Sequence, residues 1–136
     1  MGKIMYKDHE YSGMKGIQDY IIEENESDNG WSYRKWANGR FEMWRVYSGA
    51  PTTGTHYVTI GNLYGYRVAG FNFPSSCKPI DTNYHVDDTW IVDNGFAMSA
   101  GTVTTKTIND FGVYCLASSG NQTTVNVNLY VTGRWK

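Results

Sequence analysis

The segment at residues 31–48 restricts the fold more strongly than any other part of the chain, because it has the pattern of a β-hairpin. Aromatic or apolar side chains alternate with polar ones along residues 31–36 and again along residues 41–48, and a period of two is typical of strands with one buried face. Asn38-Gly39 lies between the two halves, and this dipeptide tolerates the two positive φ angles of a type I′ turn. The segment therefore predicts two antiparallel strands joined by a two-residue turn.

Turn signals recur along the rest of the chain at the spacing of an all-β protein. The 15 glycines and the Asn-Gly pair that ends a polar turn at residues 25–30 supply such signals, and the abundant Tyr, Trp and Thr favour pleated surfaces. About nine short strands predict an antiparallel β-sandwich or a small barrel of the jelly-roll type. Residues 17–24 are the only helix candidate, and residues 71–79 are expected to cross between sheets. Further strands are expected at residues 20–23, 57–60, 63–68, 90–92, 96–100, 102–108, 112–117 and 123–132.

Within the hairpin, the period of two distributes the side chains over two faces. Trp31 and Tyr33 are expected on one face and Arg34 on the other. The Arg34 guanidinium can stack on Trp36 or Trp44, a contact worth about 1 kcal/mol. We expect the rings of the hairpin to serve packing, since a role in ligand binding would require them to be exposed.

Length and charge exclude several classes of protein. The 136 residues correspond to about one domain, and 12 basic against 13 acidic side chains give a net charge of −1. Nucleic-acid binding requires an excess of Lys and Arg, so no nucleic-acid partner is expected. No apolar run approaches the roughly 18 residues of a membrane helix, and the first residues lack the apolar stretch of a signal peptide. We therefore expect no membrane insertion, and a chain made in a cytoplasm with an extended lead-in at residues 1–20 and a β domain at residues 21–136.

The two cysteines, Cys77 and Cys115, leave two alternatives open. They can pair with each other, or they can remain two free thiols in the core. A cytoplasmic protein keeps its thiols reduced, and a buried free cysteine behaves as a small hydrophobic residue. We expect the free form.

Two stretches carry a resemblance to a known family. Residues 31–39 match the signature Trp-x-Tyr-Arg-Lys-Trp-x-x-Gly, and residues 132–136 read Thr-Gly-Arg-Trp-Lys. Both are similar to the C-terminal domain of tail-fibre and minor structural proteins from phages and prophages of Gram-positive, often gut, bacteria. Residues 71–74 and 95–107 are loosely similar to strands of that family, so the resemblance extends over about residues 20–136.

This resemblance implies a non-enzymatic receptor-binding head at the tip of a trimeric fibre. It implies attachment to bacterial cell-surface saccharide, contact with other phage structural proteins, and a location at the tail tip of a virion assembled in the host cytoplasm. Residues 1–20 depart from the pattern of the family, and two alternatives are open for them, the end of a fibre shaft or part of a separate short gene product. Two alternatives remain, a structural, adaptor or decoration domain of a virion without saccharide affinity, and a small glycan-active enzyme.

Catalytic and metal-binding patterns are weak in this sequence. A glycan-cleaving enzyme requires two carboxylates about 5–9 Å apart, and the candidates Asp81, Asp87, Asp88 and Asp93 all lie in turn-like sequence, where aspartate caps turns. Asp87 and Asp88 would also point to opposite faces of a strand. The histidines lie far apart, and no Cys-x-x-Cys spacing occurs. We expect no catalytic residue, no metal and no cofactor.

Saccharide binding requires aromatic faces for the apolar side of a sugar ring and polar side chains for its hydroxyls. Residues 81–90 combine both, and we expect them to form an irregular loop of the kind that often carries function. Tyr57, Tyr64 and Tyr66 offer a second aromatic group. The predicted ligand-binding residues are Asn83, Tyr84, His85, Asp87, Asp88 and Trp90.

Overall fold

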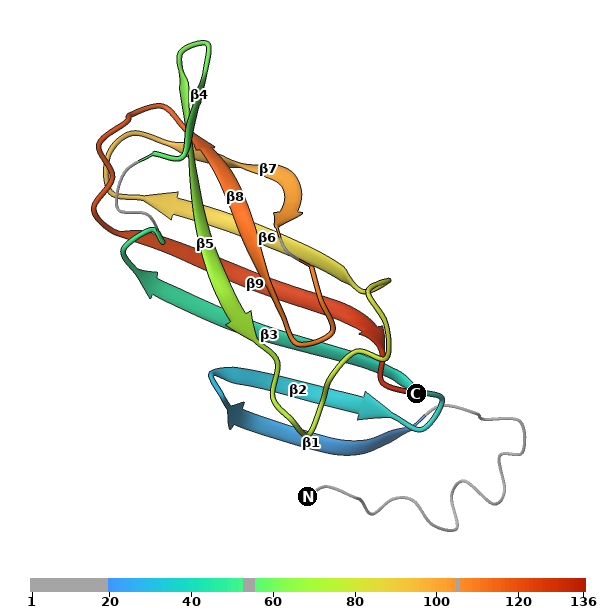
Figure 1. Cartoon of the computed structure of the whole chain (residues 1–136). Helices are drawn as coiled ribbons and strands as arrows, with labels where there is room; N and C mark the ends of the chain where they lie inside the picture. The colour runs from blue at the N-terminus through green and yellow to red at the C-terminus, as the bar shows by residue number, and fades with distance from the viewer. Residues whose placement is uncertain (1–19, 53–55, 105) are drawn as a thin grey trace.

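The protein folds as a sandwich of two antiparallel β-sheets. The computed structural model describes residues 20–52, 56–104 and 106–136, which contain nine strands and no helix. Residues 1–19 of the expected lead-in lie outside the described residues. The predicted all-β sandwich is therefore confirmed (Figure 1). The strands are β1 (Ile21–Asp28), β2 (Trp31–Trp36), β3 (Arg40–Gly49), β4 (Val58–Ile60), β5 (Leu63–Asn72), β6 (His85–Val92), β7 (Ala97–Thr104), β8 (Asp110–Ala117) and β9 (Val125–Arg134).

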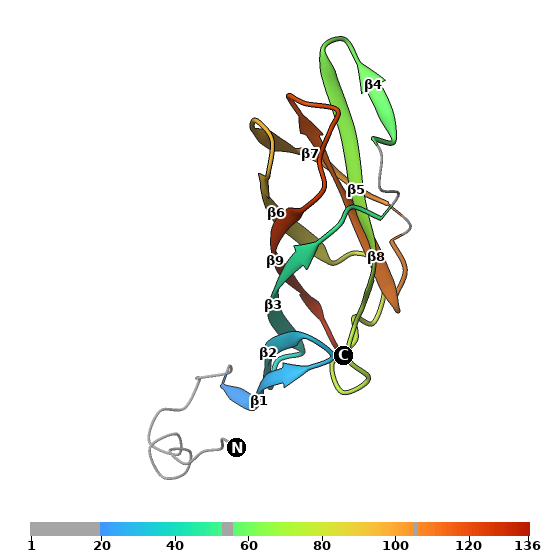
Figure 2. The same ribbon diagram turned by 90° about the vertical axis from the view of Figure 1, so that its left-hand side faces the viewer.

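The chain passes several times between the two layers. Sheet A has the strand order β1-β2-β3-β9-β6, and sheet B has the order β4-β5-β8-β7. Residues 73–84 connect β5 of sheet B to β6 of sheet A, which confirms the expected crossing near residues 71–79. Seen from the side, the β4–β5 hairpin projects past the other strands at the end of the molecule opposite the C-terminus (Figure 2).

Alternate side chains of the long strands build one shared core. Trp31 and Tyr33 of β2 are buried as expected, and the apolar side of β9 is buried as its alternation predicted. Burying one such side chain contributes roughly 1.5–3 kcal/mol. Aromatic rings fill the end of the core near the crossing segment, where Trp31 and Phe111 lie 5.9 Å and 5.4 Å from Phe73. The other fully buried strand residues are Phe41, Met43, Tyr66, Val113, Cys115, Ala117, Val125, Val127 and Val131.

The two Asn-Gly pairs form different turns. Asn29 and Gly30 have φ angles of 55° and 84°, so this pair forms the turn with two positive φ angles, and β1 extends further than the turn expected at residues 25–30. At the second pair only Gly39 has a positive φ, of 97°. The Gly39 amide donates to the carbonyl of Trp36 (3.0 Å), and residues 37–39 all lie outside the strands. The predicted hairpin is confirmed, but its two-residue turn is wrong, because a three-residue loop with glycine in the left-handed position closes it.

Several predicted boundaries are wrong. Residues 85–90, expected in an irregular loop, belong to strand β6 and pair with β9. Residues 96–100 and 102–108, expected as two strands, contribute to the single strand β7, whose register shifts between Ser99 and Val103. Gly101 at this shift has a φ of 74°, which is typical of a β-bulge. In the helix candidate, residues 21–24 lie in β1.

Both cysteines are buried free thiols. Burial raises the pKa of Cys77 to about 12 and that of Cys115 to about 11. A thiol with so high a pKa is poorly nucleophilic at neutral pH. Their contribution is therefore to packing, as the sequence led us to expect.

Candidate functional site

The outer surface of sheet A carries polar, charged and aromatic side chains side by side. Side chains alternate between the two sides of a strand, so the neighbours of the buried residues in β2, β3, β9 and β6 point outward. The register aligns Ser32, Trp44, Tyr130 and Asp87 across four strands. We call this surface the sheet A face. Its members are Glu24, Ser32, Arg34, Trp36, Arg40, Glu42, Trp44, Val46, His85, Asp87, Thr89, Ile91, Asn128, Tyr130 and Thr132.

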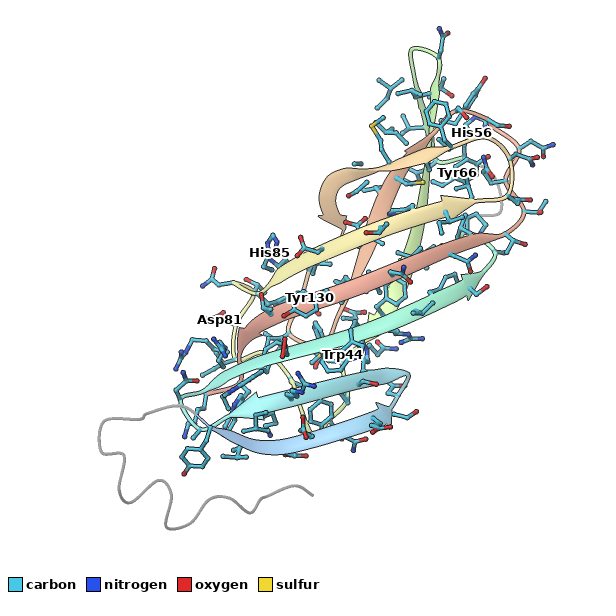
Figure 3. The ribbon with its side chains drawn as sticks, turned by 180° about the vertical axis from the view of Figure 1, so that it is seen from behind. Trp44, His56, Tyr66, Asp81, His85 and Tyr130 are labelled. Carbon is cyan, nitrogen blue, oxygen red and sulfur yellow. The ribbon has the colours of Figure 1, made fainter. Side chains whose placement is uncertain are left out.

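Two aromatic rings at the centre of the sheet A face are open to solvent. Trp44 of β3 and Tyr130 of β9 are direct cross-strand neighbours, with exposed fractions of 37% and 39%. Side chains in this relation lie close enough to contact each other. Figure 3 shows both residues on the same side of the sheet as His85. Trp44, which belongs to the hairpin, thus has the exposure that ligand binding requires.

A chain of charged hydrogen bonds runs across four strands beside these rings. Arg34 Nε lies 2.6 Å from Glu24 Oε2, and Arg34 Nη1 lies 3.4 Å from Glu42 Oε2. The Tyr130 hydroxyl donates to Glu42 Oε1 (2.5 Å). Arg34 also stacks on Trp44 at 5.3 Å, which confirms one of its two expected partners; the other, Trp36, lies under Arg40 instead. Exposed ion pairs of this kind contribute about 0–1 kcal/mol to stability, so their main effect is to hold the side chains in place.

These contacts change the pKa of two members of the face. The hydrogen bond to Glu24 raises the pKa of the Arg34 guanidinium above its ordinary value. The hydrogen bond to the Glu42 carboxylate raises the pKa of the Tyr130 hydroxyl, because it stabilises the protonated phenol. At neutral pH Arg34 is therefore a cation and the Tyr130 phenol is neutral.

Two hollows lie on either side of the Arg34–Glu42 pair. The larger, of about 360 Å³, is lined by Trp44 and by side chains of β1 and β2 that include Glu24 and Glu26. The smaller, of about 190 Å³, is lined by Tyr130 and Thr132 together with side chains of β2 and β3. The larger hollow reaches the lower end of the range typical of small-molecule sites. The face can thus receive a flat or shallowly inserted polar molecule.

The structure separates the six residues predicted as a ligand loop. Tyr84 is 2% exposed, and its hydroxyl donates to the Thr107 carbonyl (2.7 Å). Trp90 is 5% exposed, and its Nε1 donates to Asp88 Oδ2 (2.6 Å). These rings belong to the core and cannot stack on a ligand, because Trp90 points inward from β6 and Tyr84 is buried directly before that strand. Asn83 is exposed at the turn before β6, where its amide donates to Asp81 Oδ1.

His85 and Asp87 are the two predicted residues that belong to the sheet A face. Their side chains lie 3.0 Å apart, and in the register they oppose Thr132 and Tyr130. The second predicted group is separated as well, since Tyr66 is fully buried whereas Tyr57 is half exposed on sheet B. Ligand binding by His85 and Asp87 stays a prediction.

Sequence reasoning missed Trp44, Glu42 and Tyr130 as site residues. The signal for Tyr130 was present, because it lies on the polar side of a strand whose other side is apolar. The pairing of β3 with β9, which brings Tyr130 beside Trp44, joins residues more than 80 positions apart, 130 against 44. Local patterns do not encode that pairing.

The four candidate catalytic aspartates have other partners or positions. Asp81 caps its own turn, as predicted, by accepting a hydrogen bond from the Asn83 amide. Asp93 instead accepts hydrogen bonds from the distant backbone amides of Thr123 and Thr124. Asp87 and Asp88 lie in a strand rather than a turn, and Asp88 binds inward to Ser99 and Trp90. Their predicted orientation to opposite faces is confirmed.

Among residues 20–52, 56–104 and 106–136, no group of three or more His, Cys, Asp or Glu side chains is placed to hold a metal ion. The described part of the chain has no helix long and apolar enough to cross a membrane. Comparison with models of protein families, with curated proteins and with solved structures finds no significant match to this chain.

Proposed function

We propose that this chain is a non-enzymatic receptor-binding head of the phage tail-fibre type, which attaches to bacterial cell-surface saccharide through the sheet A face. The observation that carries the proposal is the pair Trp44 and Tyr130, two neighbouring aromatic rings exposed on a sheet and flanked by hollows. The resemblance of residues 31–39 and 132–136 to phage proteins supplies the biological setting, a trimeric head at the tail tip of a virion, attached to other phage structural proteins.

Saccharide chemistry fits this surface in two respects. One side of a pyranose ring presents C–H groups, which pack on the face of an indole or phenol, while its edges present hydroxyls that require hydrogen-bond partners. Trp44 and Tyr130 provide the first, and Glu24, Arg34 and Glu42 provide the second. These polar groups are already held by one another on a sheet, so little conformational entropy is lost when a ligand binds.

A shallow open site of this kind implies weak binding by a single chain. Many copies on one virion would raise the overall affinity, because each further contact becomes intramolecular once the first has formed. This combination of weak sites and high copy number suits attachment to a repeating surface polymer.

The alternative of a virion adaptor domain without saccharide affinity has one observation in its favour, an apolar outer surface on sheet B that suits protein contacts. The enzyme alternative has less support, because Asp81, Asp88 and Asp93 are engaged in hydrogen bonds within the fold.

The test is binding of the full chain to a panel of purified cell-wall polysaccharides from Gram-positive bacteria. We expect the unmodified protein to bind at least one of them without cleaving it, and Trp44→Ala to abolish that binding. The matched control is Phe96→Ala, which removes an aromatic ring that is 63% exposed in the turn before β7, outside the sheet A face. If no polysaccharide binds, or if Trp44→Ala binds as well as Phe96→Ala, the proposal fails and the adaptor alternative becomes the better account.

A further inference from the structure

The outer surface of sheet B is apolar over several adjacent strands. The register aligns Val58, Gly65, Leu116 and Met98 across the whole sheet, and Ile60 opposes Leu63 in the neighbouring row. We call this surface the sheet B face. Its apolar side chains are strongly exposed, with exposed fractions of 43% for Val58, 55% for Ile60 and 51% for Met98. Soluble monomers rarely leave such side chains contiguous and uncovered.

Strand β4 pairs with β5 along one edge, and its side chains on both faces are exposed. All three of its residues, Val58–Ile60, are exposed, although two of them are β-branched and apolar. The strand lies at the edge of sheet B, on the hairpin that projects past the sandwich (Figure 1). Edge strands of natural proteins are usually protected by charges or proline, and β4 has neither.

A hollow of about 350 Å³ lies on the same face. Gly65 forms part of its wall, and Val58, Ile60, Tyr57 and Leu116 surround it. A Cβ added at Gly65 would lie 2.8 Å from Val58 Cγ1, so any larger residue there would crowd the hollow. The sheet B face therefore has projecting apolar side chains and an apolar recess close to one another.

The sheet B face carries almost no charge. Across the rows that contain Val58 and Tyr114, the only charged side chain in the described part of the chain is Arg67. Its guanidinium lies over the Tyr57 ring at 4.8 Å, and that ring lies 5.5 Å from Tyr114. The cation thus lies over one ring of an aromatic pair.

We infer that a second copy of this chain covers the sheet B face. When identical faces meet, every charge is brought near its own copy, so a nearly neutral face associates with itself without repulsion. Projecting residues such as Ile60 can occupy the recess beside Gly65 of the neighbouring copy, because both features lie on one face. Two identical faces that meet directly form a pair about a two-fold axis, whereas in a closed ring of three the projecting Ile60 of each copy would enter the recess beside Gly65 of the next copy. The trimeric head of the proposed function also requires contact between copies, and this inference assigns that contact to the sheet B face; it does not depend on saccharide binding.

The experiment measures the solution mass of the full chain by light scattering on a sizing column, over a series of protein concentrations. One chain has a mass of 15.4 kDa. We expect the unmodified protein to have the mass of two or three chains, and Ile60→Asp to have the mass of one. The control is Ile91→Asp, at an isoleucine of similar exposure (59%) on the sheet A face, which should keep the unmodified mass.

A second measurement guards against misfolding of the variant. Hydrogen exchange of the unmodified protein should slow at Val58–Ile60 as the protein concentration rises, with no such change in β1. A single-chain mass for the unmodified protein, unchanged mass in Ile60→Asp, or exchange in β4 that is independent of concentration would each overturn the inference. A monomer whose sheet B face binds a lipid vesicle or a different protein would overturn it too, and none of these results would affect the polysaccharide test.

Discussion

The two outer faces of the sandwich differ sharply although the sheets share one core. The sheet A face presents Trp44 and Tyr130 beside a chain of ion pairs and hydrogen bonds. The sheet B face presents Val58, Ile60 and Leu116 around an apolar hollow. Both inner faces meet the same requirement of dense apolar packing, so they resemble each other. The outer faces meet no such requirement, and their composition reflects what each of them contacts.

This comparison suggests a division of labour. A polar aromatic surface suits a hydroxyl-rich ligand that exchanges with water, whereas a neutral apolar surface suits a lasting contact with protein. If one copy covers the sheet B face of another, the sheet A faces remain free to point away from the contact. Substitutions in the core, on the sheet A face and on the sheet B face should therefore change different properties of the protein.

The largest effect should come from the core that supports both faces. Trp31 is fully buried, and its Nε1 donates to the Asn72 carbonyl (2.8 Å). We expect Trp31→Ala to lower the free energy of unfolding by about 3–5 kcal/mol, because it leaves a cavity and removes one of the two side-chain hydrogen bonds that the Asn72 carbonyl accepts, the other coming from Asn29. Denaturant unfolding followed by circular dichroism measures the change. Trp44→Ala is the control, with a loss below about 1 kcal/mol; equal losses in the two variants would contradict the assignment of inner and outer faces.

Alkaline pH should lower the free energy of unfolding through three buried groups of the core. Burial raises the pKa of Tyr33 to about 12, that of Cys77 to about 12 and that of Cys115 to about 11, from ordinary values of 10.0 for tyrosine and 9.0 for cysteine. The unfolded chain releases these protons first as the pH rises, so the free energy of unfolding should be constant below about pH 8 and fall between pH 9 and 12. Denaturant midpoints at a series of pH values measure this. A midpoint that stays constant from pH 9 to 12 would show that these groups are not buried.

A third prediction separates the outer faces from each other. Tyr130→Ala should weaken binding of a short saccharide fragment by tenfold or more, about 1.4 kcal/mol, while the solution mass stays the same. Tyr57→Ala on sheet B should do the reverse, lowering the solution mass while the affinity per chain stays the same. Isothermal titration with a fragment too short to bridge two sites measures the affinity. If Tyr57→Ala loses saccharide affinity and Tyr130→Ala keeps it, the ligand binds sheet B, which would contradict our account.

The smallest effect should come from one hydrogen bond of the sheet A face. Glu42→Gln removes the carboxylate that raises the pKa of Tyr130. We expect that pKa to fall toward the ordinary tyrosine value, with a stability change below about 1 kcal/mol because the ion pair with Arg34 is exposed. Ultraviolet titration of the phenol absorbance measures it, with Tyr130→Phe identifying the signal. An unchanged titration curve in Glu42→Gln would mean that Glu42 does not hold the Tyr130 hydroxyl.

The sequence predicted the inner faces well and the outer faces poorly, for one physical reason. Alternation in residues 31–36 and in β9 marks which side of a strand is buried, and packing enforces that pattern strongly. It does not say which strands become neighbours. The expected loop at residues 81–90 shows the consequence, because its polar residues suggested a loop while the pairing with β9 makes most of it a strand at the edge of sheet A.

The candidate site required the pairing of distant strands. His85 and Asp87 were chosen from composition and do lie on the sheet A face, but Tyr84 and Trp90 alternate with polar residues and point into the core. The same alternation would have excluded Trp90 from the predicted ligand-binding residues if β6 had been recognised as a strand. Trp44 and Tyr130 became a pair only when β3 was seen beside β9. The apolar sheet B face likewise emerges from four strands together.

The most direct test of the account is a two-dimensional NMR titration with a cell-wall saccharide that the protein binds. It follows the indole N–H signals of the five tryptophans as the saccharide is added. The account predicts that the Trp44 signal moves most while that of buried Trp31 stays in place, together with backbone shifts around Tyr130 and none around Val58 or Leu116. Shifts confined to sheet B, or a saccharide that binds without moving Trp44, would contradict it.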